Sequence, residues 1–312
     1  RLISSFVSWR WIFVINVPLC LLMFVLGYRR MHGSESRSPM PDIRSSLYLA
    51  GTIGFLLVFL DGMASGSIGM WATLSSGVLA VSSVVLLCSR LRERIENPVL
   101  DASIFRNREF LLLLSTYVLS TMVALGTEYL LPYYLQISCG MDQLTNALFV
   151  CIIALVMSLT AVPTGRWCDR SGCRTPVAIS LLLRIGFSAS FMFILPEWGY
   201  VPLVVTLMTM GLSYGLSGTS QSTRVVQHCR PEHQSEASAF MTLMYYVGST
   251  LGVMGYAFVF SLSGNGLEQA VQLSSDAVVS GLHLAAILGV VLSILALVFT
   301  LMVPNRVERQ DR

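Results

Sequence analysis

The sequence contains no lysine, and charged residues make up only 12% of its 312 positions. A soluble domain carries about 25% charged residues, so this composition excludes an ordinary soluble protein. Hydrophobic residues account for 54% of the chain, and the mean hydropathy is +0.69. The composition therefore indicates an integral membrane protein. The small net charge of +3 gives no reason to expect a nucleic-acid partner.

Paired metal-ligand spacings and nucleotide-binding loops are also missing. Cys168 and Cys173 share one short loop, but neither a second thiol pair nor a histidine pair lies nearby. We therefore predict no metal site and interpret the cysteines as small buried hydrophobic residues. There are seven: Cys20, Cys88, Cys139, Cys151, Cys168, Cys173 and Cys229. Because no P-loop is present, direct coupling to ATP is not expected, and the sequence predicts no cofactor.

Long apolar runs dominate what is present. A membrane-spanning helix needs roughly 20 apolar residues, and about nine runs in this chain reach that length. They lie at 11–28, 46–63, 69–88, 110–136, 143–164, 175–195, 199–220, 236–262 and 280–303. The fold class predicted from them is an all-α polytopic membrane protein.

The arginines indicate how these spans are oriented. Five polar segments hold 17 of the 20 arginines: 29–46, 89–109, 165–175, 223–236 and 304–312. Alternating spans place all five on one side of the membrane. The loops on the other side contain acids but no arginine: Asp61–Ser67, Ser138–Asp142, Pro196–Gly199 and Ser263–Asp276. By the positive-inside rule the first group is cytoplasmic, so we expect a cytoplasmic C-terminus and an external N-terminus.

The first span has distinct anchors at its two ends. Trp9, Arg10 and Trp11 suit the external headgroup level, and Arg29 and Arg30 suit the cytoplasmic end. The chain begins with Arg1 instead of Met, and an odd number of spans cannot form two matching halves. We therefore expect that an N-terminal portion is missing.

Five stretches in register support a family resemblance. They are WRWIFVINVP, RIENPVLDASIFRNREF, LLPYYLQISCGMDQLTNAL, GRWCDRSGCRTP and ASAFMTLMYYVGSTLGVMGYA. Together they resemble the fourteen-span drug:proton antiporters of the major facilitator superfamily, the EmrB/QacA type. The resemblance covers nearly the whole chain and implies a partial major facilitator superfamily fold that lacks about the first five helices.

The resemblance also implies a domain organisation. Residues 1–30 are the last helix of a truncated N-terminal six-helix domain, 31–45 a cytoplasmic loop, 46–88 an extra helix pair, 89–109 a cytoplasmic linker, 110–304 the C-terminal six-helix domain and 305–312 a cytoplasmic tail.

The implied function is multidrug efflux across the plasma membrane, or the inner membrane of a Gram-negative bacterium. Protons are exchanged for hydrophobic, cationic toxic compounds by alternating access, with the proton gradient as the energy source. The expected partners are the lipid bilayer, such substrates, protons and the missing N-terminal helices of the same protein. Two alternatives stay open: a proton-coupled carrier of another small metabolite, and a truncated membrane remnant that does not transport.

Two charged residues fall inside predicted spans. Glu128 lies well inside the span 110–136, where burial of an ionised carboxylate is costly. We predict that it faces the bundle interior and acts in proton coupling or binds the substrate's charge; the alternative is a position near the external interface. Arg184 is the only arginine within a span. It is either a cavity-facing charge paired with an acid such as Glu128, or an interfacial anchor.

The cytoplasmic loop 165–174 carries the candidate gating residues Gly165, Asp169, Arg170, Gly172 and Arg174. Its glycines permit a tight turn, and its arginines can pair with carboxylates on neighbouring helices. We predict a latch that closes in one conformation and breaks in the other. The alternative is a loop that fixes orientation by its charge alone.

A third set of candidates lies on the run 236–262. Gly248, Gly252 and Gly255 recur at four and three residues, which favours close helix packing.

Aromatic and methionine side chains on the runs 110–136 and 236–262 are candidates for a substrate pocket through cation–π contacts and adaptable thioethers. The alternative is an interfacial aromatic belt. These side chains are Tyr129, Tyr133, Tyr134, Tyr245, Tyr246, Met122, Met241 and Met244.

An enzymatic function is not expected. The segment Gly215–Gly218 has the G-x-S-G pattern of intramembrane serine proteases, and His283 is a candidate base for Ser217. The two residues fall toward opposite membrane faces, so we expect them to be too far apart to react.

Overall fold

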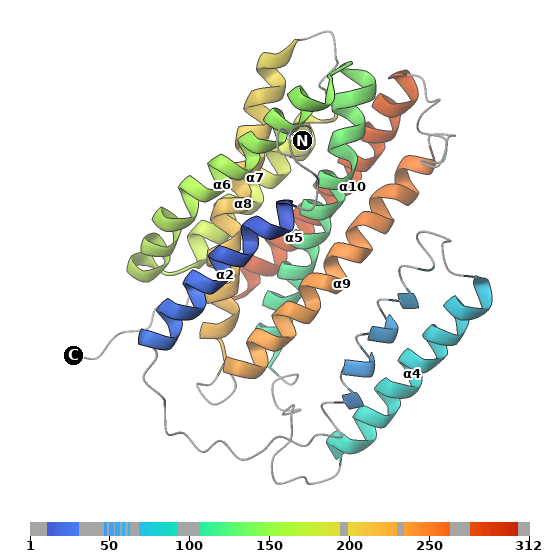
Figure 1. The fold of residues 1–312 in the computed structure, drawn as a ribbon, viewed down its shortest axis with the longest axis vertical. Helices are drawn as coiled ribbons and strands as arrows, with labels where there is room; N and C mark the ends of the chain where they lie inside the picture. Colours follow the sequence, from blue (N-terminus) through green and yellow to red (C-terminus); the bar gives the residue numbers. More distant parts are fainter. Residues whose placement is uncertain are drawn as a thin grey trace. The chain divides into compact units, whose positions relative to one another are not determined.

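A computed structural model describes residues 11–30, 47–48, 50–52, 54–56, 58–59, 62, 69–92, 107–193, 199–229, 234–262 and 275–304. The chain divides into two compact units, Arg1–Met40 and Pro41–Arg312. Every regular element among the described residues is helical (Figure 1). The predicted all-α class is therefore confirmed for this part of the chain.

The first unit contains helix α2, Trp11–Arg30, which agrees with the apolar run 11–28. Its described apolar side chains are exposed, as in Leu21, Met23 and Phe24. Phe24 stacks on Tyr28 one turn later, with ring centroids 6.2 Å apart. Such a surface is suited to lipid, because no hydrophilic face is present in the described part of the helix.

Besides helical residues within 47–62, the described part of the second unit contains seven longer α-helices and one short π-helix. They are α4 (Met70–Arg92), α5 (Arg108–Tyr133), the π-helix η2 (Tyr134–Ser138), α6 (Gln143–Ser171), α7 (Arg174–Ser190), α8 (Tyr200–Gln227), α9 (Gln234–Ser261) and α10 (Ser275–Met302). Five described helices are long and apolar enough to cross a membrane: Arg108–Ser138, Gln143–Ser171, Tyr200–Gln227, Ala237–Ser261 and Val278–Met302. Most of the predicted runs thus correspond to helices.

Helix α4 packs along the segment that precedes it in sequence. Small residues make the contacts possible: Thr73 meets Gly62, and the ring of Phe59 lies over Gly77. The order of these contacts runs in opposite directions along the two segments, so they are antiparallel. Much of the run 46–63 lies outside the described residues.

Local sequence signals explain where the bundle helices begin and turn. The side chain of Asn107 accepts the backbone N–H of Glu109 at 3.1 Å and thereby caps α5. Asp142 caps α6 in the same way through Leu144. At the other end of α6, Gly172 adopts φ +81°, which other residues avoid, and lets the chain turn directly into α7.

Helices α5 to α10 form one bundle made of two equivalent triplets, α5–α7 and α8–α10 (Figure 1). The first helix of each triplet packs most extensively along the middle helix of the other, α5 on α9 and α8 on α6. The first helix also packs on the last helix of the other triplet, α5 on α10 and α8 on α7. Because α5 and α8 run in opposite directions, the triplets are related as an inverted repeat.

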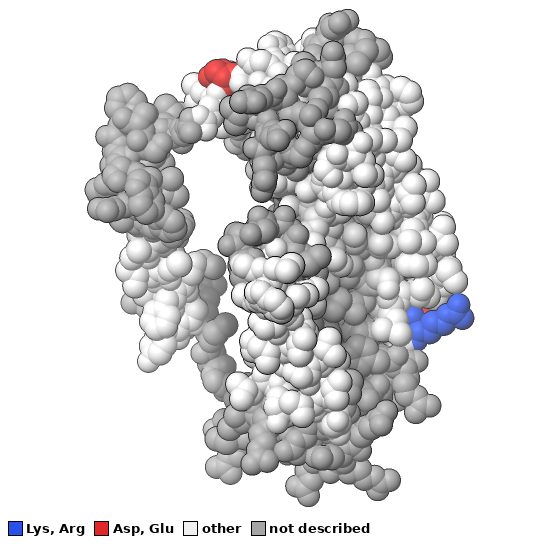
Figure 2. Space-filling view, turned by 90° about the vertical axis from the view of Figure 1, so that its right-hand side faces the viewer, with Lys and Arg blue, Asp and Glu red and all other residues white. Residues whose placement is uncertain are grey.

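The core is unevenly distributed along the bundle. A large cluster that includes Leu130, Tyr134, Phe191 and Phe260 fills the end where α5 finishes and α8 begins. A smaller cluster around Phe110, Val225, Met241 and Val303 occupies the opposite end. Figure 2 shows a face on which the described surface is almost entirely uncharged.

Candidate functional site

Glycines bring α5 and α9 into direct backbone contact. A Cβ on Gly252 would lie 2.7 Å from Cα of Met122, and one on Gly248 would lie 3.1 Å from the carbonyl oxygen of Val118. Further along, Gly126 of α5 accommodates the ring of Tyr256, since a Cβ on Gly126 would lie 2.6 Å from Cγ of that ring. The pairs 248–118, 252–122 and 256–126 advance in step, so the two helices are parallel.

The predicted glycine face is only partly correct. Gly248 and Gly252 lie in the α5–α9 contact, but a Cβ on Gly255 would meet only Leu288 of α10, at the ordinary distance of 3.9 Å. Gly255 follows Gly252 by three residues, which rotates it away from α5 and toward the neighbouring helix. Close approach therefore requires glycine at two of the three positions.

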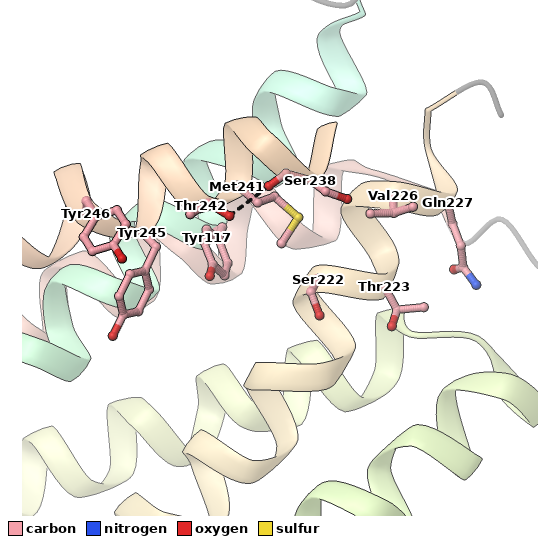
Figure 3. A pocket seen from close by; sticks show the side chains of 10 residues that line it. All are labelled: Tyr117, Ser222, Thr223, Val226, Gln227, Ser238, Met241, Thr242, Tyr245 and Tyr246. Atoms are coloured by element: carbon pink, nitrogen blue, oxygen red, sulfur yellow. Dashed lines mark hydrogen bonds between the residues drawn. The ribbon is translucent and has the colours of Figure 1, made fainter. Parts of the chain in front are cut away.

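A pocket of about 610 Å³ opens beyond this contact, at the end of the bundle predicted to be cytoplasmic (Figure 3). Its walls come from α5, α8 and α9. The lining residues are Tyr117, Ser222, Thr223, Val226, Gln227, Ser238, Met241, Thr242, Tyr245 and Tyr246. The volume is within the range of about 300–1,000 Å³ that is typical of small-molecule sites.

The α9 wall is one helical stripe. Ser238, Met241, Thr242, Tyr245 and Tyr246 follow the i, i+3, i+4, i+7, i+8 spacing of a single helix face. Tyr245 and Tyr246 lie edge to face with ring centroids 5.6 Å apart. None of the ten lining side chains carries a formal charge. The pocket thus combines aromatic rings, a thioether and hydroxyl groups.

The structure brings only part of the predicted pocket set together. Tyr245, Tyr246 and Met241 line the pocket, whereas Met244 packs against the core cluster around Phe110. Tyr129 and Tyr133 contact each other edge to face at 5.8 Å, far along α5 toward its other end. Their position beside Glu128 in the sequence suggests a pocket role, but the rise of the helix carries them past the pocket.

Glu128 is exposed and accepts no hydrogen bond from any described residue. Its carboxylate also lies near enough to the buried Tyr214 to interact electrostatically with that phenol. The exposure therefore does not contradict the predicted inward orientation, and the coupling role of Glu128 stays a prediction. Glu128 follows Tyr117 by eleven residues, which is close to three helical turns, so the two residues share one face of α5 about 16 Å apart. The carboxylate and the pocket are consequently presented on the same side of this helix.

Arg184 is buried in the bundle core, with only 2% of its surface exposed. Its guanidinium donates to the carbonyl oxygen of Ser120, to the hydroxyl of Ser217 at 3.1 Å and to that of Ser213 at 3.4 Å. It also lies over the ring of Tyr214, 5.2 Å from the centroid. This burial does not fit an interfacial anchor, and no acid pairs with Arg184 among the described residues.

A polar network around Arg184 joins α5, α7 and α8. Gln221 donates to the hydroxyl of Ser120 at 2.9 Å, and the phenol of Tyr214 donates to the carbonyl oxygen of Ala124 at 3.0 Å. Ser213 donates to the carbonyl oxygen of Ser180. These partners satisfy a charge that is otherwise costly to bury. No pattern in the sequence points to them, because serine is common throughout the helices of this chain.

Residues 165–171, predicted as part of a cytoplasmic loop, are instead the last turns of α6, and only Gly172 and Cys173 separate α6 from α7. This α6–α7 turn is held against the end of α10. Arg174 donates to the carbonyl oxygen of Leu301 at 2.9 Å. Arg224 of α8, which no sequence pattern singles out, donates to the carbonyl oxygens of Thr300 at 3.2 Å and Val303 at 2.8 Å. Two cations therefore satisfy the C-terminal carbonyls of α10 and its negative dipole end. Asp169 and Arg170 are exposed beside them, and Gly165 is half-buried.

The cysteines are not uniformly buried. Cys20 and Cys151 are exposed, Cys139 and Cys229 are half-buried, and Cys88 has no described side chain. Cys168 and Cys173 are buried side by side, and the hydrogen bond between their thiols, together with burial, raises the pKa of Cys173. No group of three metal-ligating side chains occurs among the described residues.

Ser217 lies in the polar core of the bundle. Its hydroxyl accepts from Arg184 and donates to the carbonyl oxygen of Tyr214 at 3.2 Å. Since its hydrogen bonds are made with these two residues, Ser217 belongs to the Arg184 network.

Comparison with known proteins agrees with this architecture. The Major Facilitator Superfamily model matches residues 1–253. The Probable transport protein HsrA of Haemophilus influenzae is 25% identical over 82% of this chain and 55% of its own length. The Lincomycin resistance protein LmrB of Listeria monocytogenes is 24% identical over 97% of the chain and 65% of its own. The Multidrug resistance protein B homolog of Mycobacterium tuberculosis is 25% identical over 78% and 46%. The chain spans about half to two thirds of these relatives.

Proposed function

Because this chain belongs to the Major Facilitator Superfamily, we propose that it is part of a secondary active exporter. It exchanges protons for hydrophobic, cationic compounds by alternating access, and it works in the plasma membrane with a cytoplasmic C-terminus. The names of two relatives, a lincomycin resistance protein and a multidrug resistance protein homolog, support export of toxic compounds. The fourteen-span antiporter type is part of this proposal.

The pocket between α5, α8 and α9 is the observation that carries the proposal. It is large enough for a drug-sized molecule, its lining residues lack formal charge, and three tyrosine rings line it. Aromatic rings bind organic cations through their negative faces without the cost of desolvating a carboxylate. Since the pocket lies at the end predicted to be cytoplasmic, it receives substrates from inside the cell.

Glu128 is the proposed proton-coupling group. It lies on the pocket-bearing face of α5, is exposed, and is held by no hydrogen bond in the described structure. A carboxylate in this setting can exchange a proton with water and is free to bind a cation instead. Competition between a proton and a cationic substrate for one carboxylate is sufficient to couple their movements.

The α6–α7 turn, with the predicted gating residues at 165–174 around it, is the proposed gate. Arg174 and Arg224 fasten the end of α10 to α7 and α8 through backbone carbonyls. The bond from Arg174 connects helices of the two triplets, so a rearrangement between the triplets would have to break or re-form it. The contacts are with carbonyl oxygens, whereas the sequence suggested carboxylates.

The test is transport by the protein expressed from its complete gene in inside-out membrane vesicles. We expect ethidium uptake when a proton gradient is imposed, loss of uptake on addition of a protonophore, and at least tenfold weaker uptake by Tyr245→Ala combined with Met241→Ala. Leu159→Ala, on the exposed face of α6, is the control. Absence of gradient-dependent uptake of every cation in a panel would show that this protein is not such an exporter.

A further inference from the structure

Three aliphatic hydroxyl groups that line the pocket donate their hydrogens to backbone carbonyl oxygens. Thr242 donates to the carbonyl oxygen of Ser238 at 3.1 Å, which is the bond drawn in Figure 3. Ser238 donates to the carbonyl oxygen of Gln234 at 2.9 Å. Ser222 points its hydroxyl at the carbonyl oxygens of Gly218 and Thr219, each 2.9 Å away. In each case the acceptor belongs to the residue's own helix.

This arrangement determines what the three hydroxyls offer a ligand. A hydroxyl has one hydrogen to donate and two lone pairs that accept. Because the hydrogen is used within the helix, only lone pairs remain for the pocket. Ser238 and Thr242 lie one turn apart on α9, and Ser222 stands on α8, so acceptors come from two walls of the same cavity (Figure 3).

The other lining groups add to this electron-rich character. The rings of Tyr117, Tyr245 and Tyr246 offer π faces, and their phenol groups rotate to donate or accept. The hydroxyl of Thr223 likewise rotates to donate or accept. Gln227 has its carbonyl oxygen facing the thiol of Cys173 at 3.8 Å, which leaves its amide hydrogens as fixed donors. The pocket therefore has few fixed donors and no cation among its lining residues, and it is suited to ligands that donate.

We propose that this pocket selects ammonium ions that carry an N–H group, meaning protonated primary, secondary or tertiary amines, over quaternary ammonium ions of the same shape. The proposal rests on the proposed export function and specifies its substrate class. Both kinds of ion gain cation–π attraction from the tyrosines. Only the protonated amine can also donate a charge-assisted hydrogen bond to the lone pairs of Ser222, Ser238 or Thr242.

A matched pair of probes isolates this hydrogen bond. A naphthylpropyl-dimethylammonium ion and its trimethylammonium analogue carry the same charge and aromatic group and differ by one methyl in place of the N–H. Their dissociation constants are measured by calorimetry at pH 7 on the protein expressed from its complete gene and held in lipid nanodiscs. We expect the dimethylammonium ion to bind about tenfold more tightly. A tenfold ratio of dissociation constants corresponds to the contribution of one charge-assisted hydrogen bond.

The variants Thr242→Val, Ser238→Ala and Ser222→Ala, alone and together, remove acceptors with little change of shape. We expect the triple variant to bring the ratio of the two dissociation constants close to one by weakening only the dimethylammonium ion. Thr250→Val and Ser249→Ala are matched controls on α9: their hydroxyls also donate to a carbonyl of their own helix, at 2.9 Å, but they do not line the pocket. Both should keep the wild-type ratio.

Two results would overturn the selectivity: equal binding of the two ions by the wild-type protein, or a tenfold ratio that survives the triple variant. Transport in energised vesicles distinguishes this failure from that of the export function. If both ions are transported equally well, export stands and the selectivity is wrong. If neither is transported although the ratio and its loss are observed in binding, the selectivity stands and export is wrong.

Discussion

The helix pairs α5–α9 and α6–α8 are the two equivalent contacts between the triplets, yet their ends on the predicted cytoplasmic side differ. Both are parallel and both rely on glycine: Gly252 meets Met122 in the first pair, and a Cβ on Gly215 would lie 2.8 Å from the carbonyl oxygen of Met157 in the second. Toward the end predicted to be cytoplasmic, α6 and α8 remain near each other, since a Cβ on Gly165 would lie 3.8 Å from Thr219. In the same direction α5 and α9 carry the tyrosines of the pocket.

This difference shows how one architecture can give one seam that stays closed and one that opens into a pocket. Glycine sets the distance between two backbones, and that requirement is common to both pairs. On α9 the tyrosines that precede the glycines, Tyr245 and Tyr246, line the pocket together with residues of α8. Glu128 also lies on the α5 face that bears the pocket, so charge and pocket are both on the α5–α9 side.

The largest expected effect is at the α5–α9 contact. Gly252→Leu must push apart two backbones that already touch, and overpacking of this kind costs typically about 1–3 kcal/mol and at times more. We expect strongly reduced abundance and a lower midpoint of thermal unfolding for the detergent-solubilised protein. Gly255→Leu, which meets only Leu288 at 3.9 Å, should have a much smaller effect. Equal melting temperatures for the two variants would remove the close-contact interpretation.

The α6–α8 pair provides the parallel experiment. A Cβ on Gly215 would collide with Thr160 and Met157, whereas one on Gly218 would meet nothing within 4 Å. Gly215→Leu should therefore destabilise the protein about as much as Gly252→Leu, and Gly218→Leu should leave the unfolding midpoint nearly unchanged. If only one of the two seams is sensitive, the triplets are not equivalent in packing, and the comparison of the two pairs has to be revised.

A smaller effect on stability, but a large one on transport, is expected at Glu128. Glu128→Gln keeps the size and polarity of the side chain but cannot gain or lose a proton, so proton-driven efflux should fall by roughly a hundredfold. Glu128→Asp should retain part of the activity. Efflux of dyes is measured in inside-out vesicles at several imposed pH gradients, with abundance matched by immunoblot.

The outcome at Glu128 distinguishes its two proposed roles. Partial loss for doubly charged cations, with little loss for singly charged ones, would assign it to substrate charge instead of proton coupling. Unchanged efflux of every substrate at every gradient would remove it from the mechanism.

The sequence predicted the helices better than it predicted their contacts. Apolar runs and arginine-rich breaks were enough to locate the helices, since length and hydropathy decide insertion in a bilayer. The α9 stripe of Ser238, Met241 and Tyr245 could also be recognised from its spacing. Which face of α5 is exposed depends on how six helices pack, so the exposure of Glu128 was not predictable from one helix. The partners of Arg184 come from α5 and α8, far away in sequence.

The smallest predicted effect concerns the tyrosines that distinguish the α5–α9 pair. Tyr245 lines the pocket with 39% of its surface exposed and supports the ring of Tyr246. Tyr245→Ala removes one π face and the area it buries against a ligand, so we expect the KM for an aromatic cation to rise about tenfold. The maximal rate should change little, because the ring binds the substrate and takes no part in proton exchange.

Two further variants make this prediction specific. Tyr245→Phe keeps the ring face and should retain near-wild-type KM for cations. Tyr129→Ala removes a tyrosine of the same helix bundle that packs on Tyr133 and does not line the pocket, so it should leave KM unchanged. The measurement is the initial rate of dye uptake by inside-out vesicles over a range of dye concentrations. A rise in KM for Tyr129→Ala that equals that for Tyr245→Ala would place the binding surface along the whole of α5, because only a site that extends past Glu128 could be affected by both.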